Sequence, residues 1–190
     1  LKCHYPDVFA AAIINSQPMG FYSPSQLVRD AKEHGVKILP PDINLATYDC
    51  TLEPETFDQR KLHQKNSEMA DDIKSSHSVR LGFRQIKGIG EKEAILIDEN
   101  RPSCGIYSTV RSLWLKTGLS KGAMEKLADA DAFRSIGLDR RAALWQVRAL
   151  DRLAKKDRMP LFDHGINAAT DLQNEPTANL PLMPQSEHVI

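Results

Sequence analysis

Apolar residues recur at helical spacing over most of this chain, and two short extended runs interrupt the helical pattern. Val8–Ile14 predicts a first helix, while Ser23–Gln26 predicts the capped start of a second helix that ends at Gly35. Tyr48–Leu52 and Ser78–Phe83 are typical of short strands that pair with each other. The pattern therefore predicts a mainly α fold with a small β element.

Two further segments have less regular patterns. Val36–Leu39 predicts a strand or extended piece that Pro40-Pro41 stops, because a residue before proline is pushed out of helical conformation. The polar stretch Glu53–Ser76 predicts a loop, and its composition leads us to expect mobility over residues 54–77.

From residue 106 to residue 150 the pattern is helical again. The expected core residues of this region are Val110, Leu113, Trp114 and Leu115. Trp145 is either a core residue or a stacking platform for a base, and its helical spacing with neighbouring apolar residues favours the core. After Ala154 the residues are rich in proline, asparagine and glutamine, which predicts a linker over 155–190.

The most informative stretch is Gly88-Ile89-Gly90, which lies between Phe83–Lys87 and Glu91–Leu96. It predicts two short helices joined by a hairpin, because the two glycines permit positive φ and close backbone approach. The amides that open the second helix attract an anion, and Lys87 and Lys92 flank that point.

This pattern is that of a helix-hairpin-helix motif, which binds duplex DNA through the sugar-phosphate backbone with little sequence preference. An ordinary turn between helices is the alternative interpretation. A dinucleotide-binding loop requires a third glycine where Glu93 stands, and the Gly-Lys-Ser/Thr of a Walker A loop is absent.

A second, degenerate copy of the motif follows. Lys121–Ala128 predicts its first helix, Asp129–Phe133 its turn and Gly137–Trp145 the start of its second helix. Asp129 and Asp131 could be mistaken for a metal-binding pair, but alanines surround both residues and no strand carries them. A helix-terminus role in the turn is favoured instead.

Lys and Arg number 25 and Asp and Glu number 25, so that the net charge is zero. This balance argues against binding of nucleic acid by bulk electrostatics, and any DNA contact is expected to be local. A solvated helix face is the alternative for each basic residue. The residues predicted to bind DNA are Arg84, Lys87, Gly88, Ile89, Gly90, Lys92, Lys121, Arg140 and Arg141.

Cys3, Cys50 and Cys104 are too widely spaced for a disulfide framework or a zinc site, and they suit a reducing cytoplasm. No apolar run is long enough to cross a bilayer, so we expect no membrane partner. The chain lacks an initiator Met, and we expect it to be an excised segment of a longer protein.

Several ordered stretches resemble bacterial C-family DNA polymerases, and the error-prone type more closely than the replicative polymerase III α subunit. They are Leu1–Pro6, Gly35–Asn44, Leu81–Gly90, Ala128–Phe133 and Asp139–Ala142. The resemblance implies a distal fingers segment over 1–47, a short strand pair with a polar loop over 48–83 and a tandem helix-hairpin-helix domain over 83–154. Residues 155–190 would then be a linker toward an oligonucleotide-binding domain.

The resemblance also implies partners and cofactors. The partners would be duplex DNA and the remainder of the polymerase, which would act in DNA replication, repair and translesion synthesis. The family's catalytic palm aspartates lie upstream of Leu1, so we expect no catalytic residue or cofactor here, although magnesium is implied for the parent enzyme.

Two positions depart from the replicative pattern. Asp131 stands where glycine is usual, and Arg158 replaces the glutamine of the sliding-clamp peptide. Clamp binding through Leu161 and Phe162 is therefore expected to be weak or lost.

The residues leave other classes open. The chain could be a non-catalytic helix-hairpin-helix module of a repair nuclease or ligase, since those enzymes use the same motif. It could also be a structural helical domain without a ligand. The Leu1–Pro6 and Ile38–Asn44 segments favour the polymerase, because a nuclease arm has no reason to contain them.

Overall fold

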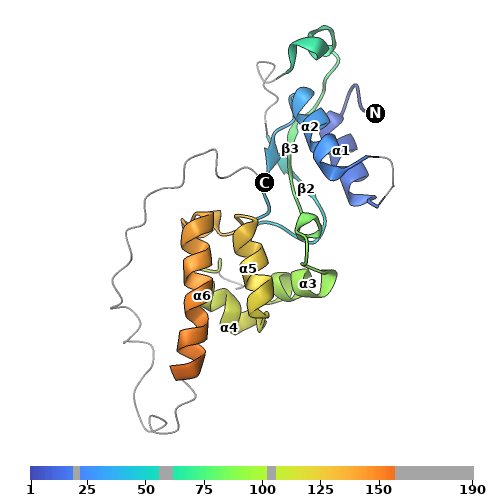
Figure 1. Cartoon of the computed structure of the whole chain (residues 1–190). Helices are drawn as coiled ribbons and strands as arrows, with labels where there is room; N and C mark the ends of the chain where they lie inside the picture. Colours follow the sequence, from blue (N-terminus) through green and yellow to red (C-terminus); the bar gives the residue numbers. More distant parts are fainter. Residues whose placement is uncertain (19–21, 56–61, 102–105, 157–190) are drawn as a thin grey trace.

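The structure, a computed structural model, describes residues 1–18, 22–55, 62–101 and 106–156, and the side chains only as far as residue 150 (Figure 1). Two hydrophobic clusters organise the described part. The smaller one joins the first two helices to the sheet, and the larger one lies among the helices after residue 83. The mainly α fold with a small sheet is therefore confirmed.

The first part contains α1 (Pro6–Asn15) and α2 (Pro24–Glu33) packed beside the sheet. The predicted capping box at the start of α2 is confirmed, because the Ser23 hydroxyl accepts from the Gln26 amide and the Gln26 side chain accepts from the Ser23 amide. Leu27 and Ala31 of α2 are buried as expected, while Val28 is half-buried.

The sheet has three strands in the order β1-β3-β2. β2 (Thr51–Pro54) and β3 (His77–Arg80) pair antiparallel, with Leu52 opposite Val79, which confirms the predicted strand pair. β1 (Ile38–Leu39) joins the other edge of β3 in parallel.

The polar stretch between β2 and β3 contains structure that the composition did not indicate. Gln64–Met69 forms a 3₁₀ helix, η2, and the Asn66 side chain donates to the Glu33 carbonyl at 2.9 Å. At the end of the stretch the buried carboxylate of Asp7 accepts from the Ser75 hydroxyl at 3.0 Å and from the amides of Ser76 and His77. The loop prediction is thus wrong for η2. Residues 56–61 lie outside the described part.

The second part is helical (Figure 1). Its elements are η3 (Phe83–Gln85), α3 (Glu91–Glu99), α4 (Val110–Thr117), α5 (Lys121–Asp129), η4 (Arg134–Ile136) and α6 (Arg140–Lys156). Val110 and Leu113 are buried and Trp114 is half-buried, as expected, but Leu115 is exposed. Trp145 is 59% exposed, so the core interpretation of this residue is wrong.

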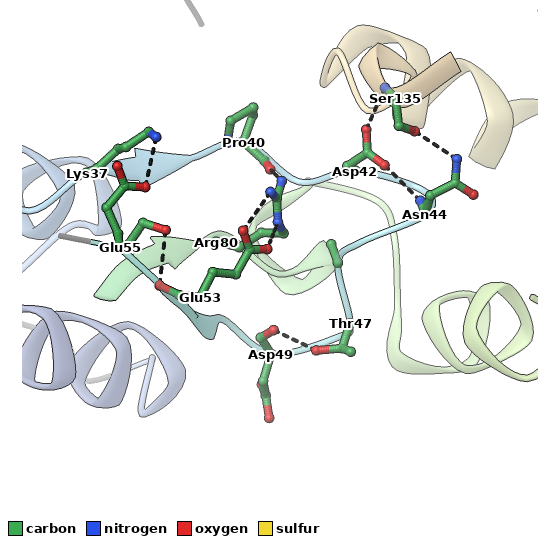
Figure 2. A network of polar contacts seen from close by, with 12 residues as sticks. Lys37, Pro40, Asp42, Asn44, Thr47, Asp49, Glu53, Glu55, Arg80 and Ser135 are labelled. Carbon is green, nitrogen blue, oxygen red and sulfur yellow. Dashed lines mark hydrogen bonds and ion pairs between the residues drawn. The ribbon is translucent and has the colours of Figure 1, made fainter. Parts of the chain in front are cut away.

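Residues 42–48, here called the connecting segment, run from β1 toward β2. They contact the helical part at two places, η4 and η3. The Asp42 carboxylate accepts from the Ser135 amide at 3.0 Å, and the Asn44 amide group donates to the Ser135 hydroxyl at 2.8 Å (Figure 2). At the other end, the Thr47 carbonyl accepts from the Phe83 amide at 2.9 Å. The segment therefore fixes η3 and η4 relative to each other.

Tyr107 extends this polar framework into the core. Its amide donates to the Asn44 side chain at 2.7 Å and its hydroxyl donates to the Ile97 carbonyl at 2.8 Å. Burial raises the pKa of the Tyr107 phenol, so the hydroxyl stays a proton donor at neutral pH.

Candidate nucleic-acid interface

The first hairpin, residues 83–94, begins with a single turn rather than a full helix. η3 ends at Gln85, and Ile86 is its C-cap residue. The Ile86 amide donates to the Phe83 carbonyl at 2.9 Å, and the Ile86 backbone is extended. The predicted first short helix is therefore wrong in type. Phe83 and Ile86 still bury their side chains as the apolar face that the sequence predicts.

The two glycines of the first hairpin play different parts. Gly88 has φ of 92°, which is the positive value that the pattern predicts. Gly90 has φ of −93° and is the N-cap residue of α3. Gly90 therefore does not use the positive φ that glycine permits, and its missing side chain matters for another reason. A Cβ there would lie 2.8 Å from a carboxylate oxygen of Glu93.

The N-terminus of α3 has no capping side chain from Gly90. The amide of Gly90 itself donates to the Glu93 carboxylate at 3.0 Å, and the helix supplies no acceptor for the amides of its first turn. Glu93 is half-exposed and attached through a flexible side chain, so that a stronger anion can displace it.

Three lysines lie along the turn that precedes this N-terminus. Lys87 and Lys92 are exposed on either side of the turn, as the sequence predicts. Lys126 of α5 is the third, because its Cγ lies 3.6 Å from the position that a Cβ on Gly88 would occupy. Its side chain therefore passes alongside the turn. No sequence pattern indicates Lys126, because it lies far from Gly88 along the chain.

Arg84, which the sequence predicts to bind DNA, makes several contacts within the chain. Its guanidinium pairs with Asp49 at 2.9 Å, donates to the Asn15 carbonyl and lies 4.8 Å from the centroid of the Tyr48 ring. These contacts join η3 to α1 and to the connecting segment. Arg84 thus has a structural role in the folded chain.

The second hairpin, residues 129–143, has aspartates in its turn and at the start of α6. The Asp139 carboxylate accepts from the Ala142 amide at 2.7 Å and so caps α6. Asp131 has φ of 58°, a backbone region that favours glycine, and its carboxylate pairs with Arg134. The helix-terminus role expected for the two turn aspartates is consistent with this geometry.

The remaining predicted residues lie around the second hairpin. Arg140 pairs with Asp129 at 3.8 Å, Arg141 is exposed on α6, and Lys121 is half-buried at the start of α5. The structure therefore gathers Lys87, Lys92 and the turn glycines at one point, with Arg140 and Arg141 at another. Leu161 and Phe162 lie outside the described residues.

Metal sites and membrane spans are two other kinds of site that the described part could contain. No group of three or more His, Cys, Asp or Glu side chains that could hold a metal ion occurs there. None of its helices is both long and apolar enough to cross a membrane. Cys3 is exposed and Cys50 is buried, and both are free thiols.

Residues 35–143 match the helix-hairpin-helix motif family, and this range is more than half of the 190 residues. Together with the two hairpins, the match shows that the chain belongs to the helix-hairpin-helix motif family.

The chain is also similar over its whole length to error-prone DNA polymerases. It is 51% identical over 191 residues to Error-prone DNA polymerase 1 of Rhizobium meliloti and 53% identical over 189 residues to Error-prone DNA polymerase of Mesorhizobium japonicum. The identity to the Brucella abortus enzyme is 46% over 192 residues. The chain spans only 15–17% of the length of these relatives.

Proposed function

We propose that this chain is the duplex-DNA-binding portion of an error-prone DNA-directed DNA polymerase. The observation that carries the proposal is the first hairpin, where a helix N-terminus without an N-cap side chain and a positive-φ glycine adjoin a turn along which three exposed lysines lie. The whole-chain similarity to error-prone polymerases supports this class over a repair nuclease or ligase.

The contact would hold a phosphate of the DNA backbone. The helix dipole and the unpaired first-turn amides favour an anion, and Lys87, Lys92 and Lys126 neutralise its charge. The base edges are not reached in such a contact, so binding is independent of base sequence. A local contact of this kind also fits a chain with no net charge.

The polymerase reaction would belong to other parts of the parent protein. Magnesium and deoxynucleotides require a carboxylate cluster, and the described residues do not provide one, so no catalytic step is assigned to them. Damage-tolerant synthesis in replication and repair would be the task of that parent. The free thiols of Cys3 and Cys50 suit the bacterial cytoplasm as its location.

The test is a titration of the chain with duplex DNA at several salt concentrations. Lys87→Ala should weaken binding about eightfold at 0.1 M monovalent salt and lower the salt slope by about one unit, because one counterion-releasing contact is lost. The loss should be equal for duplexes of unrelated sequence.

The matched control is Lys65→Ala, which removes the same charge from an exposed residue of η2, far from the first hairpin along the chain. This variant should bind like the wild type. An equal loss in both variants, or a loss that depends on the duplex sequence, would contradict a phosphate contact at the first hairpin.

A further inference from the structure

The helix α6 has two unlike faces. Its buried residues Ala143, Val147 and Leu150 follow each other at helical spacing and are 0–5% exposed. Trp145 lies two residues after Ala143, which turns it to the opposite side of the helix. Arg141 and Arg148 are four and three residues away from Trp145, so they share its exposed face.

An exposed tryptophan at this place is unusual for a folded helix. Indole is a large apolar group that most often packs into a core or a binding interface. At 59% exposure, Trp145 contributes little to the core that Val147 and Leu150 form. Its ring is therefore available to a ligand.

The surroundings of Trp145 are basic. Between Asp139 and Asp151 the helix carries no acidic residue. Neither Arg141 nor Arg148 makes an ion pair with any side chain that the structure describes. The exposed face therefore has one aromatic ring, with one arginine before it and one arginine after it along the helix.

This combination suits single-stranded nucleic acid better than a protein. The centre of a protein interface is depleted of charge and has several apolar residues together, whereas the exposed neighbours of Trp145 one turn away on either side are Arg141 and Arg148. Proteins bind single-stranded nucleic acid with aromatic rings that stack on the bases and with cations that contact the flanking phosphates. Arg141 and Arg148 are separated by about 10 Å along the helix axis, which leaves room for a base between two phosphate contacts.

We propose that the exposed face of α6 binds single-stranded nucleic acid, with a base stacked on Trp145 and phosphates bound by Arg141 and Arg148. This contact is separate from the backbone contact of the first hairpin. It would let one chain hold duplex DNA at the hairpin and an unpaired strand at α6.

The test uses the full chain and a 12-nucleotide oligothymidylate. Trp145 is one of two tryptophans, so Trp114→Phe gives a background in which the fluorescence reports Trp145 alone. The oligothymidylate should quench this fluorescence. Trp145→Ala should weaken binding about tenfold or more, while Trp145→Phe should retain part of the affinity because it keeps an aromatic face.

One control variant and one further test variant separate stacking from other effects. Leu115→Ala removes an equally exposed apolar side chain from α4 and should leave oligothymidylate binding unchanged. Arg148→Ala should lower the salt slope of oligothymidylate binding by about 0.7, the value for one phosphate of a single strand.

The results that would overturn this proposal differ from those that would contradict the phosphate contact at the first hairpin. Lys87→Ala should weaken duplex binding and leave the quenching by oligothymidylate intact. An equal loss of both would show that the single strand binds at the first hairpin. Equal quenching by blunt duplex would exclude stacking, and a self-association that Trp145→Ala abolishes would assign the face to a second copy of the chain.

Discussion

The two hairpins share a backbone plan and differ in charge. Each contains Phe-Arg-x-Ile, from Phe83 and from Phe133, and each then has a glycine with positive φ, 92° at Gly88 and 77° at Gly137. In each, a buried alanine lies four residues after the N-cap position of the following helix. The shared residues are those that the turn and the core require.

The difference lies where a phosphate would bind. Gly90 leaves the N-terminus of α3 without a side-chain cap, whereas Asp139 places its own carboxylate on the Ala142 amide of α6. The first hairpin also has Lys87 between its isoleucine and its glycine, and the second has no counterpart. We therefore expect an external anion to bind more readily at the first hairpin, where Gly90 has no side chain, than at the second, where the Asp139 carboxylate already accepts from an amide of α6.

The largest expected effect is on stability, and it concerns the residue that precedes Phe83 or Phe133. This residue is Gly82 beside the first hairpin and Ala132 in the second. A Cβ on Gly82 would lie 2.2 Å from the Tyr48 carbonyl oxygen and 2.4 Å from the Asp49 carbonyl carbon, which are backbone atoms of fixed position. Gly82→Ala should therefore destabilise the chain by about 3 kcal/mol, measured by urea unfolding.

Two variants serve as controls for this change. Gly122→Ala in α5 meets nothing closer than 4.0 Å and should stabilise the chain by about 0.5–1 kcal/mol, because alanine is the better helix former. Ala132→Gly removes one buried methyl group and should cost about 1–2 kcal/mol. A stable Gly82→Ala variant would show that the connecting segment can move away from η3.

An intermediate effect is expected from alanine at the two positive-φ glycines. Gly88→Ala and Gly137→Ala should each lower the free energy of unfolding by about 1–2 kcal/mol, because a Cβ is strained in this backbone region. Only Gly88→Ala should also weaken duplex binding, since the turn at Gly88 carries the proposed phosphate contact. Equal losses of binding would mean that both hairpins contact the duplex.

The sequence predicts the local features of this fold well. The capping box at Ser23, the strand pair and the positive φ of Gly88 all follow from neighbouring residues, because caps, ladders and tight turns depend on short-range chemistry. The gathering of Lys87, Lys92 and the turn glycines follows for the same reason.

The features that depend on tertiary structure could not be predicted in this way. Lys126 reaches Gly88 only because α5 packs beside the first hairpin. The sequence favours the core for Trp145 because Leu144 and Val147 accompany it at helical spacing, yet the buried stripe runs through Ala143 and Val147 and leaves Trp145 on the opposite side. The burial of Asp42 and Asn44 likewise depends on Ser135 and Tyr107, which are distant in sequence.

The smallest expected effect tests the charge difference directly. Glu93→Gln keeps an acceptor for the Gly90 amide and removes a negative charge from the N-terminus of α3. Because that carboxylate competes with the phosphate, the substitution should tighten duplex binding about threefold at low salt, and the gain should fade as salt screens the charge.

Asp139→Asn preserves a good N-cap on α6 and removes the same charge from the second hairpin. This variant should bind duplex DNA as the wild type does, since no phosphate would approach a self-capped helix. A gain in the Asp139 variant that equals the gain in the Glu93 variant would place DNA at both hairpins and remove the functional distinction between them.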